Sequence, residues 1–406
     1  MTSSVPQQTA KKQTAPRQTA VRATYMRGGT SKGVFFTPED LPAAVRGAGP
    51  ARDRFMLRVI GSPDPYAKHT DGMGAATSST SKVVIVGKSE RADCDVDYLF
   101  GAVSIGTPVV DWSGNCGNLT SAVGPFAISR GLVTAPAEGL ATVRIWQANI
   151  GKRIIAHVPM QDGEVVELGD FELDGVAFPA AEIPLEFLDP GAEESDDGGG
   201  AMFPTGHRVD TLDVPGVGPV AATLINAGNP AIFVEAKTLG LSGVELQGDI
   251  NGKTELLQRL EAIRSYAAVK MGLAASMEEA SSKRLHTPKL CFVGPPAGYT
   301  ASSGKAVAAG DMDIAARIMS MGALHHAMTG TGAVALAVAA AIDGTIVNRV
   351  LGGGEHPRVR FGHPSGTLSV GAEAKEVDGE WVVTQAVMSR SARRLMEGHV
   401  LVPMAD

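Results

Sequence analysis

The sequence predicts an α+β protein with many short strands and few helices. Three observations support this fold class. Apolar β-rich runs outnumber helical segments, two small-residue helices follow polar, glycine-containing turns, and the order of these features recurs in the second half. The chain has 406 residues, which favours two or three domains over a single core.

The predicted strands are short apolar or alternating runs that are rich in β-branched residues. They are 82–86, 141–147, 153–158, 220–225, 231–235, 290–293, 358–361 and 381–387. Helical spacing of apolar residues predicts five helices. These are 51–60, 119–130, 254–271, 311–319 and 333–342. The acidic, glycine-rich stretch 189–200 is predicted to be a linker or surface loop.

Composition and charge exclude several classes of protein. The net charge of −7 argues against nucleic acid as a partner. The longest apolar stretch, 333–342, is too short to span a membrane. The segment 1–20 repeats Gln-Thr-Ala, has no apolar core of a secretory signal, and is predicted to be a disordered tail. Three cysteines without CxxC spacing favour a reducing, cytoplasmic location.

A weak internal repeat relates the two halves of the chain. The segment 328–334 can be laid over 115–121, and the turn 226–229 resembles the turn 27–30. A duplicated domain would bring two helix N-termini to one cleft, which would suit a small molecule with two or three negative charges. We expect a first domain over 21–215 and a second over 216–385, with 386–406 returning to the first.

Cys116 stands between Asn115-Gly114 and Gly117-Asn118, directly before an apolar helical run. This setting predicts a thiol at a helix N-terminus, where unpaired N–H groups and the helix dipole favour a thiolate or a bound carboxylate. A small buried cysteine that only packs is the alternative. Cys94, among acidic residues, and Cys291, in an apolar strand, are expected to be structural.

Lys82 ends a run of small hydroxyl residues and is followed at once by the apolar 83–86. Burial at the start of such a strand would favour the neutral amine and make this lysine a plausible base. An exposed, snorkelling lysine is the alternative. The loop 25–33 lacks Walker order, and its donors could hold a carboxylate or form a plain tight turn.

No other motif points to a cofactor or a metal. A GxGxxG turn at a strand–helix junction is absent, so a dinucleotide site has no support. His325 and His326 are adjacent and would point in different directions, so a shared metal ion is not expected.

These segments together resemble the PrpF family of aconitate-type isomerases, which have the diaminopimelate-epimerase-like fold. The resemblance spans about residues 22–404. It rests on the segments 26–33, 61–65, 76–82, 97–100, 112–118, 226–230 and 329–333. It implies two similar domains, each a β-barrel-like sheet around a central helix, with the active site between them. Epimerases of this fold carry a cysteine at each central helix, whereas Thr329 occupies the second position here.

The resemblance implies Lys82 and Cys116 as the proton-handling pair, without a cofactor or a metal ion. The residues expected to bind the substrate surround the two helix N-termini and the first hairpin turn. They are Arg27, Gly28, Thr30, Ser31, Ser81, Asn115, Gly117, Asn118, Thr329, Gly330, Thr331 and Gly332. The sequence does not specify the oligomeric state, and a homodimer is compatible with it.

The function expected from this resemblance is isomerisation of an unsaturated tricarboxylate by allylic proton transfer. The first hypothesis is 2-methylaconitate cis–trans isomerisation in propionate breakdown. Tautomerisation of 4-oxalomesaconate, isomerisation of aconitate and double-bond migration in methylitaconate are alternatives that share the same acidic proton. A non-catalytic polycarboxylate-binding protein is the alternative from another class, and the absence of a second cysteine favours it.

Overall fold

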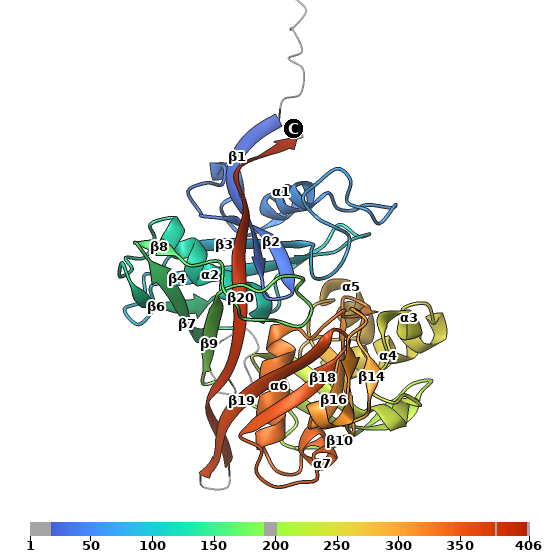
Figure 1. Cartoon of the computed structure of the whole chain (residues 1–406). Helices are drawn as coiled ribbons and strands as arrows, with labels where there is room; N and C mark the ends of the chain where they lie inside the picture. Colours follow the sequence, from blue (N-terminus) through green and yellow to red (C-terminus); the bar gives the residue numbers. More distant parts are fainter. Residues whose placement is uncertain (1–17, 191–200, 378–379, 404–406) are drawn as a thin grey trace, which may run out of the picture.

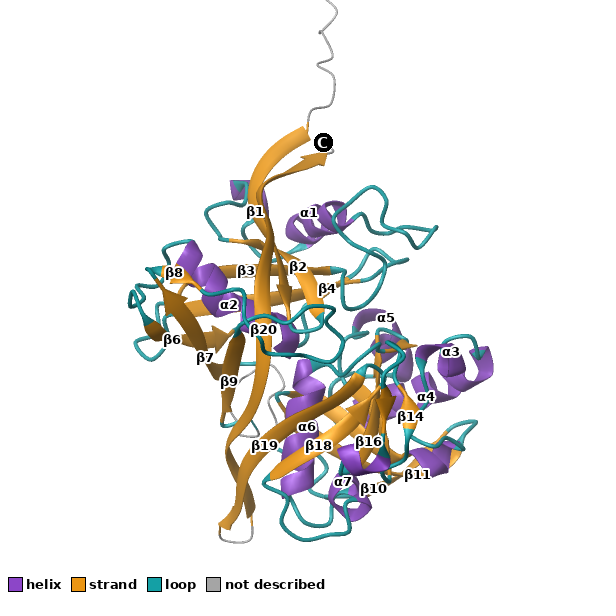
Figure 2. Ribbon diagram, viewed as in Figure 1, coloured by secondary structure: helices purple, strands orange, loops and turns teal. Residues whose placement is uncertain are grey.

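The computed structural model describes residues 18–190, 201–377 and 380–403. Figure 1 shows two sets of strands, one from each half of the chain, with one helix at the centre of each set. The central helices are α2 (Gly117–Ser129) and α6 (Gly330–Ala341). Figure 2 shows how strands outnumber helices, and the predicted α+β class is confirmed.

Eight strands of the first set close around α2. They are β1 (Gln18–Gly28), β2 (Ser31–Phe36), β3 (Lys82–Lys88), β4 (Val96–Val103), β6 (Gly139–Gln147), β7 (Lys152–Gln161), β9 (Glu182–Leu188) and β20 (Glu380–Pro403). Each strand pairs with the next in this order, and β20 pairs with β1 to complete the ring. The closed ring leaves no free edge in this set of strands.

The second set repeats the same pattern around α6. Its strands are β10 (Asp210–Val214), β11 (Gly218–Ala227), β12 (Asn229–Glu235), β13 (Lys289–Gly294), β16 (Ile314–Ser320), β18 (Arg358–His363), β19 (Gly366–Val377) and the first part of β20. The pairs β2–β3 and β4–β6 are parallel in the first set, and β12–β13 and β16–β18 are parallel at the same steps in the second. The other neighbouring strands in both sets pair antiparallel.

The register fixes the correspondence of individual residues. Val34 pairs with Val83, three residues after the start of β2, and Ile232 pairs with Leu290, three residues after the start of β12. Lys289 is therefore the structural counterpart of Lys82, since each is the first residue of its strand.

Smaller elements complete the two halves. The helices are α1 (Pro50–Ile60), α3 (Gln247–Ile250), α4 (Thr254–Lys270), α5 (Met277–Lys283) and α7 (Ile346–Val350). The short strands are β5 (Val110–Asp111), β8 (Glu164–Val165), β14 (Tyr299–Thr300), β15 (Ala306–Val307) and β17 (Ala323–Leu324). Within the described ranges, no helix is long and apolar enough to cross a membrane.

The strand β20 joins the two sets. It pairs with β19 near its start, with β9 at 385–391, and with β1 at its end. In Figure 1 it is the long red strand that runs from the lower half to the top of the upper half. Residues 385–403 thus pair with strands of the first half, but the predicted domain limits themselves stay a prediction.

Both central helices are buried on all sides. Every residue of α6 from Gly330 to Ala340 is buried, and α2 is buried from Gly117 to Ala127. A helix that is apolar all round requires such an enclosure. Small side chains in α6, mostly alanine and glycine, let the surrounding strands approach closely.

One predicted helix is wrong. The segment 311–319 forms the end of a short 3-10 turn and the strand β16. All seven residues of β16 are buried, because it pairs with β13 on one side and β18 on the other while both of its faces are covered. A continuous apolar run of this length fits a buried strand as well as a helix, and periodicity alone does not separate the two.

The predicted tail is too long by three residues. β1 begins at Gln18, where it pairs with Pro403, so ladder hydrogen bonds to β20 order a segment that has little apolar surface. Residues 1–17 lie outside the described part of the chain, as do 191–200 of the predicted linker.

The two central helices meet at glycine. A Cβ built on Gly330 would lie 2.6 Å from the backbone nitrogen of Asn118 and 2.7 Å from Cα of Gly117. Alanine normally stabilises a helix by up to about 1 kcal/mol over glycine. Here we expect Gly330→Ala to destabilise by about 1–3 kcal/mol, because backbone atoms must separate.

Thermal unfolding and turnover of Gly330→Ala would be compared with those of Gly248→Ala. Gly248 lies in α3, and a Cβ there would have no heavy atom within 4 Å. A Tm of Gly330→Ala equal to or above that of the control variant would contradict the close approach of the two helices.

Candidate active site

The site begins with two helix N-termini that face each other. Cys116 is the N-cap residue of α2 and Thr329 is the N-cap residue of α6. The Thr329 hydroxyl accepts a hydrogen bond from the Gly332 amide at 3.1 Å, whereas the Cys116 side chain makes no capping bond. Each N-terminus carries unpaired N–H groups and about half a positive charge, so this junction favours an anion.

Lys82 and Cys116 lie side by side at this junction. The Lys82 side-chain nitrogen donates to the Ser31 hydroxyl at 2.9 Å and lies 3.1 Å from the Cys116 sulfur. Both side chains are buried, at 5% exposure each. Among residues 18–190, 201–377 and 380–403, no carboxylate forms an ion pair with Lys82, so this amine has only neutral or thiol partners. The contact was expected from sequence, and the catalytic role of the two residues stays a prediction.

The first hairpin turn packs on the start of α2. A Cβ on Gly28 would lie 2.7 Å from the Asn118 carbonyl oxygen, so only glycine fits there. Thr30 accepts a hydrogen bond from the Asn118 side-chain amide at 2.9 Å. The Arg27 guanidinium donates to the carbonyl oxygens of Gly29 and Ser391, at 3.1 and 3.0 Å. Arg27 thus fastens the turn to β20, and burial lowers its pKa to about 10.

Asparagine side chains connect the two halves. The Asn115 amide donates to the side-chain oxygen of Asn229 at 2.8 Å, and the Asn229 amide group donates to the Asn115 carbonyl oxygen at 2.8 Å and to the Thr331 hydroxyl at 3.1 Å. Asn118 also donates to the Met328 carbonyl oxygen at 3.4 Å. The Asn115–Asn229 and Asn118–Met328 contacts cross between the halves, and the Asn229–Thr331 bond fixes Asn229 to the start of α6.

Ser81 directly precedes Lys82, but its side chain contacts a histidine instead of Cys116. Its hydroxyl is 3.2 Å from Nδ1 of His69, and it is 1% exposed. The fold therefore brings Lys82, Ser31 and Cys116 into direct contact, whereas Ser81 contacts His69.

Two buried cations were missed at the sequence level. Arg390 on β20 is 1% exposed, and its Nε donates to the Asn118 side-chain oxygen at 2.9 Å. Burial lowers the pKa of Arg390 to about 10. No local signal marks it, because Arg390 stands in a segment with several other serines and arginines.

Lys289 could have been found. It precedes the apolar run 290–293 just as Lys82 precedes 83–86, and the two lysines occupy equivalent positions. Its ammonium donates to the His286 carbonyl oxygen at 3.0 Å and to the Ser320 hydroxyl at 3.4 Å. Burial, and then the charge of Lys82, lower the pKa of Lys289 to about 7.

A cavity of about 470 Å³ lies between the two halves next to this junction. Its walls include 76–80, which directly precede Ser81 and Lys82, and 323–326, which lead to Thr329. Serine and threonine hydroxyls line one wall, and histidines line the other. The cavity has no aspartate or glutamate among its lining residues, which suits an anionic ligand.

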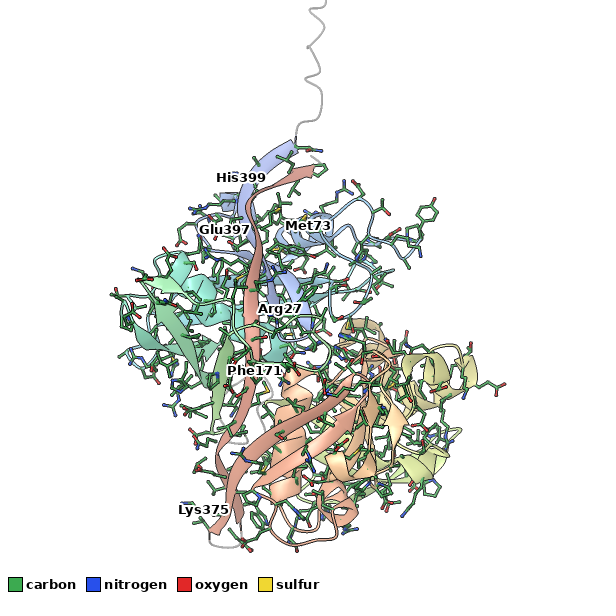
Figure 3. The ribbon with its side chains drawn as sticks, viewed as in Figure 1. Arg27, Met73, Phe171, Lys375, Glu397 and His399 are labelled. Carbon is green, nitrogen blue, oxygen red and sulfur yellow. The ribbon has the colours of Figure 1, made fainter. Side chains whose placement is uncertain are left out.

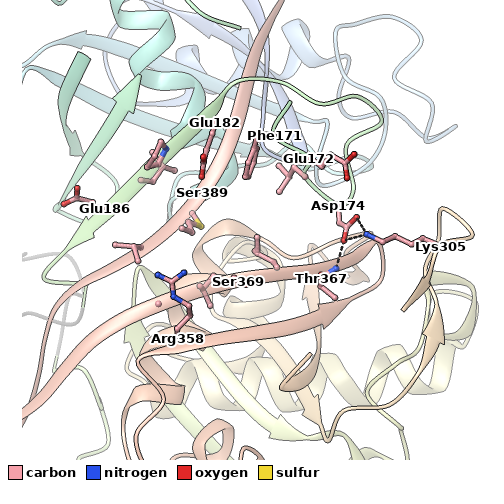
Figure 4. A pocket seen from close by; sticks show the side chains of 18 residues that line it. Phe171, Glu172, Asp174, Glu182, Glu186, Lys305, Arg358, Thr367, Ser369 and Ser389 are labelled. Atoms are coloured by element: carbon pink, nitrogen blue, oxygen red, sulfur yellow. Dashed lines mark hydrogen bonds and ion pairs between the residues drawn. The ribbon is translucent and has the colours of Figure 1, made fainter. Parts of the chain in front are cut away.

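Another cavity, of about 550 Å³, lies where β9, β19 and β20 meet (Figure 4). Four carboxylates line it, those of Glu172, Asp174, Glu182 and Glu186, against the cations Lys305 and Arg358. Asp174 already binds Lys305 at 3.1 Å. Its acidic lining makes this cavity a poor site for a polycarboxylate. Arg27, labelled in Figure 3, lies above it on β1 and does not line it.

Metal binding has little support in the described ranges. Those residues contain no group of three or more histidine, cysteine, aspartate or glutamate side chains that could hold an ion. His325 and His326 stack with their ring centroids 4.6 Å apart instead of converging on one point.

Comparison with known proteins places these features in a family. Residues 18–403 match the family model of the PrpF protein. A protein named 2-methyl-aconitate isomerase from Cupriavidus necator is 64% identical over 380 residues, which are 93% of this chain and 96% of that protein. The match thus extends over nearly the whole of both chains.

Solved structures give the same fold. A structure described as methylitaconate-delta-isomerase superimposes with a TM-score of 0.72 at 40% identity and covers 95% of this chain and 96% of that one. A hydroxyproline epimerase from Agrobacterium vitis has a TM-score of 0.53 at 12% identity, covering 95% and 93%. At that identity the likeness shows the fold alone, and it confirms the predicted two-domain epimerase-like architecture.

The buried Lys289 predicts a specific pH dependence of stability. Its folded-state pKa of about 7 lies below the usual value of 10.5, so between these values the unfolded chain holds a proton that the folded chain lacks. The free energy of unfolding should therefore rise with pH through this window, by at most about 1.4 kcal/mol per pH unit. Below pH 7 the cost of the buried ammonium is constant.

Urea unfolding of the wild type and of Lys289→Met at several pH values from 6 to 10 would isolate this contribution. Lys289 also lowers the pKa values of His286 and His325, but burial is the main cause of both shifts and is common to the two proteins. The difference in free energy of unfolding should therefore increase in favour of the wild type as the pH rises. Parallel curves would show that Lys289 titrates normally in the folded protein.

Proposed function

This chain belongs to the PrpF family, and we propose that it isomerises 2-methylaconitate, an unsaturated tricarboxylate. The enzyme class follows from its relatives, which are isomerases. The choice of substrate is supported by the 64% identity to a protein named for that reaction, against 40% to one named for methylitaconate. The sequence left a non-catalytic binding protein as an alternative. Relatives that are isomerases do not support that alternative.

The observation that supports this function most directly is the Lys82–Cys116 contact at two facing helix N-termini. In the proposed mechanism, the neutral amine of Lys82 removes an allylic C–H proton of the substrate. The electron pair delocalises over the C=C bond and a neighbouring carboxylate. Rotation about the weakened bond follows. Either Lys82 returns its proton to carbon, or the Cys116 thiol does so and then takes up the proton of Lys82 across their 3.1 Å contact, so that both residues end as they began.

The developing negative charge needs fixed donors. We propose that the amides at Gly117–Asn118 and Gly330–Thr331 bind substrate carboxylates, with Thr30 and Ser31 beside them. These donors are oriented before the reaction, which makes them effective in stabilising a dienolate. The Asn115 side-chain nitrogen is buried without a partner, which supports an acceptor group from the ligand in this place.

The setting of the reaction also stays a proposal. All three cysteines are free, which supports a cytoplasmic location. A homodimer, with which the sequence is compatible, stays a prediction. The expected partner is the small tricarboxylate itself, and no role for a cofactor enters the proposed steps.

A panel of substrates in deuterated water would test the function. We expect conversion of 2-methylaconitate between its cis and trans forms, with deuterium incorporated at the allylic carbon as the proton exchanges. Proton NMR would follow 2-methylaconitate, aconitate, 4-oxalomesaconate and methylitaconate separately. Conversion of 4-oxalomesaconate alone would overturn the choice of substrate, and conversion of none would overturn the isomerase itself.

Replacement of Lys82 would test the mechanism. General base catalysis contributes roughly 10²–10⁴-fold to a rate, so Lys82→Ala should lower kcat by at least that factor. The matched control is Lys88→Ala, at the exposed other end of β3. Circular dichroism and Tm would establish that both variants fold. A folded Lys82→Ala protein that turns over at the rate of the control would exclude Lys82 as the base.

A further inference from the structure

His325 has a buried nitrogen without a partner. The side chain is 3% exposed, and its Nδ1 accepts a hydrogen bond from the Ala327 amide at 3.1 Å. Because Nδ1 is the acceptor, the ring proton of the neutral imidazole lies on Nε2. This Nε2 has no hydrogen-bond partner. A buried donor without a partner destabilises the folded protein by about 1–3 kcal/mol, so an acceptor beside Nε2 would be favourable.

The side chain that carries the unpaired donor lines the cavity beside the junction of Lys82 and Cys116. His325 lines the 470 Å³ cavity together with the hydroxyl-rich segment 77–80, which comes from the other half of the chain. Its position is fixed by its backbone, since the His325 amide donates to the Ile318 carbonyl oxygen at 2.9 Å. Stacking on His326 fixes the plane of the ring.

The surroundings keep His325 neutral. Burial lowers its pKa well below 6.5, and the neighbouring His326, Lys82 and Lys289 lower it further. A neutral N–H group donates a hydrogen bond and does not bind a cation. The position therefore suits an oxygen acceptor on an anionic ligand, and it does not suit a metal ion or an amine.

We propose that His325 is a specificity-determining residue that donates a hydrogen bond from Nε2 to one carboxylate of the substrate. This inference rests on the proposed function, because a tricarboxylate is what brings an acceptor into the cavity. The two helix N-termini provide donors for the other carboxylates. A ligand without the carboxylate that meets His325 leaves this donor unpaired, which is how such a site discriminates.

Binding of saturated analogues would test the proposal without relying on turnover. Tricarballylate has three carboxylates, while glutarate and methylsuccinate lack the central and one terminal carboxylate respectively. Isothermal titration calorimetry would give Kd values for the wild type, His325→Phe and His325→Gln. Phenylalanine keeps a ring to stack on His326 but has no donor, whereas glutamine places an N–H group near the position of Nε2.

We expect His325→Phe to raise the Kd of tricarballylate about tenfold or more. His325→Gln should recover most of that loss, and at least one dicarboxylate should bind the wild type and His325→Phe equally. The matched control is His399→Phe, the same substitution at an exposed histidine on β20 (Figure 3) that does not line the cavity. This control should bind all three ligands as the wild type does.

Each other outcome has a defined meaning. Failure of the wild type to bind tricarballylate would overturn the proposed function, and this inference with it. Unchanged tricarballylate binding by His325→Phe, or an equal loss for all three ligands, would overturn the role of His325 alone. The ratio of Kd values between the wild type and His325→Gln should stay constant from pH 6 to 8, since Lys82, Lys289 and His326 are common to both. A ratio that favours the wild type increasingly at low pH would show a charged imidazolium and contradict the neutral donor.

Discussion

The head-to-head contact of α2 and α6 is the constraint on which the rest of this structure depends. Two helix N-termini, each with about half a positive charge, meet at Gly117 and Gly330 with their backbones in contact. Like poles repel, so the fold must hold this junction from outside. Hydrogen bonds from the Asn229 and Asn118 side chains hold the two N-termini together, and β20 pairs with strands of both sets. In the proposed function, an anionic substrate relieves the repulsion that remains.

The same constraint explains the unusual charge of the interior. Lys82, Lys289 and Arg390 are buried near this junction, and within the described ranges none of them forms an ion pair with a carboxylate. Buried cations without counter-ions destabilise a folded protein. Their partners here are carbonyl, hydroxyl and amide oxygens and, for Lys82, the Cys116 sulfur. The site is therefore preorganised for negative charge, at a cost to the stability of the empty protein.

Much of this arrangement could be predicted from the sequence, and the reasons for the rest are physical. Local patterns were sufficient for α2, α6 and most central strands, and the small-residue turns located both helix N-termini. Helix 311–319 was wrong because a strand buried on both faces loses its alternation. Arg390 was missed because its place in the sheet comes from the pairing of β20 with β9, where it lies opposite Ile183, about 200 positions earlier in the chain. Lys289 would have been found if the internal repeat had been extended from the turns to the next strand in each half, because Lys82 and Lys289 each begin that strand.

The duplicated fold carries an asymmetric site, and this asymmetry bears on the type of reaction. Lys82 has a thiol beside it, whereas its counterpart Lys289 faces a serine hydroxyl. The Thr329 hydroxyl accepts a hydrogen bond that caps its own helix. A racemase needs an acid and a base on opposite faces of one carbon. In the proposed mechanism one half holds both proton-handling groups, and the other contributes hydrogen-bond donors. A proton removed and returned on one face leaves the configuration at an sp³ carbon unchanged, but it permits rotation or migration of a double bond. The loss of symmetry at Thr329 thus favours isomerisation over epimerisation on the same scaffold.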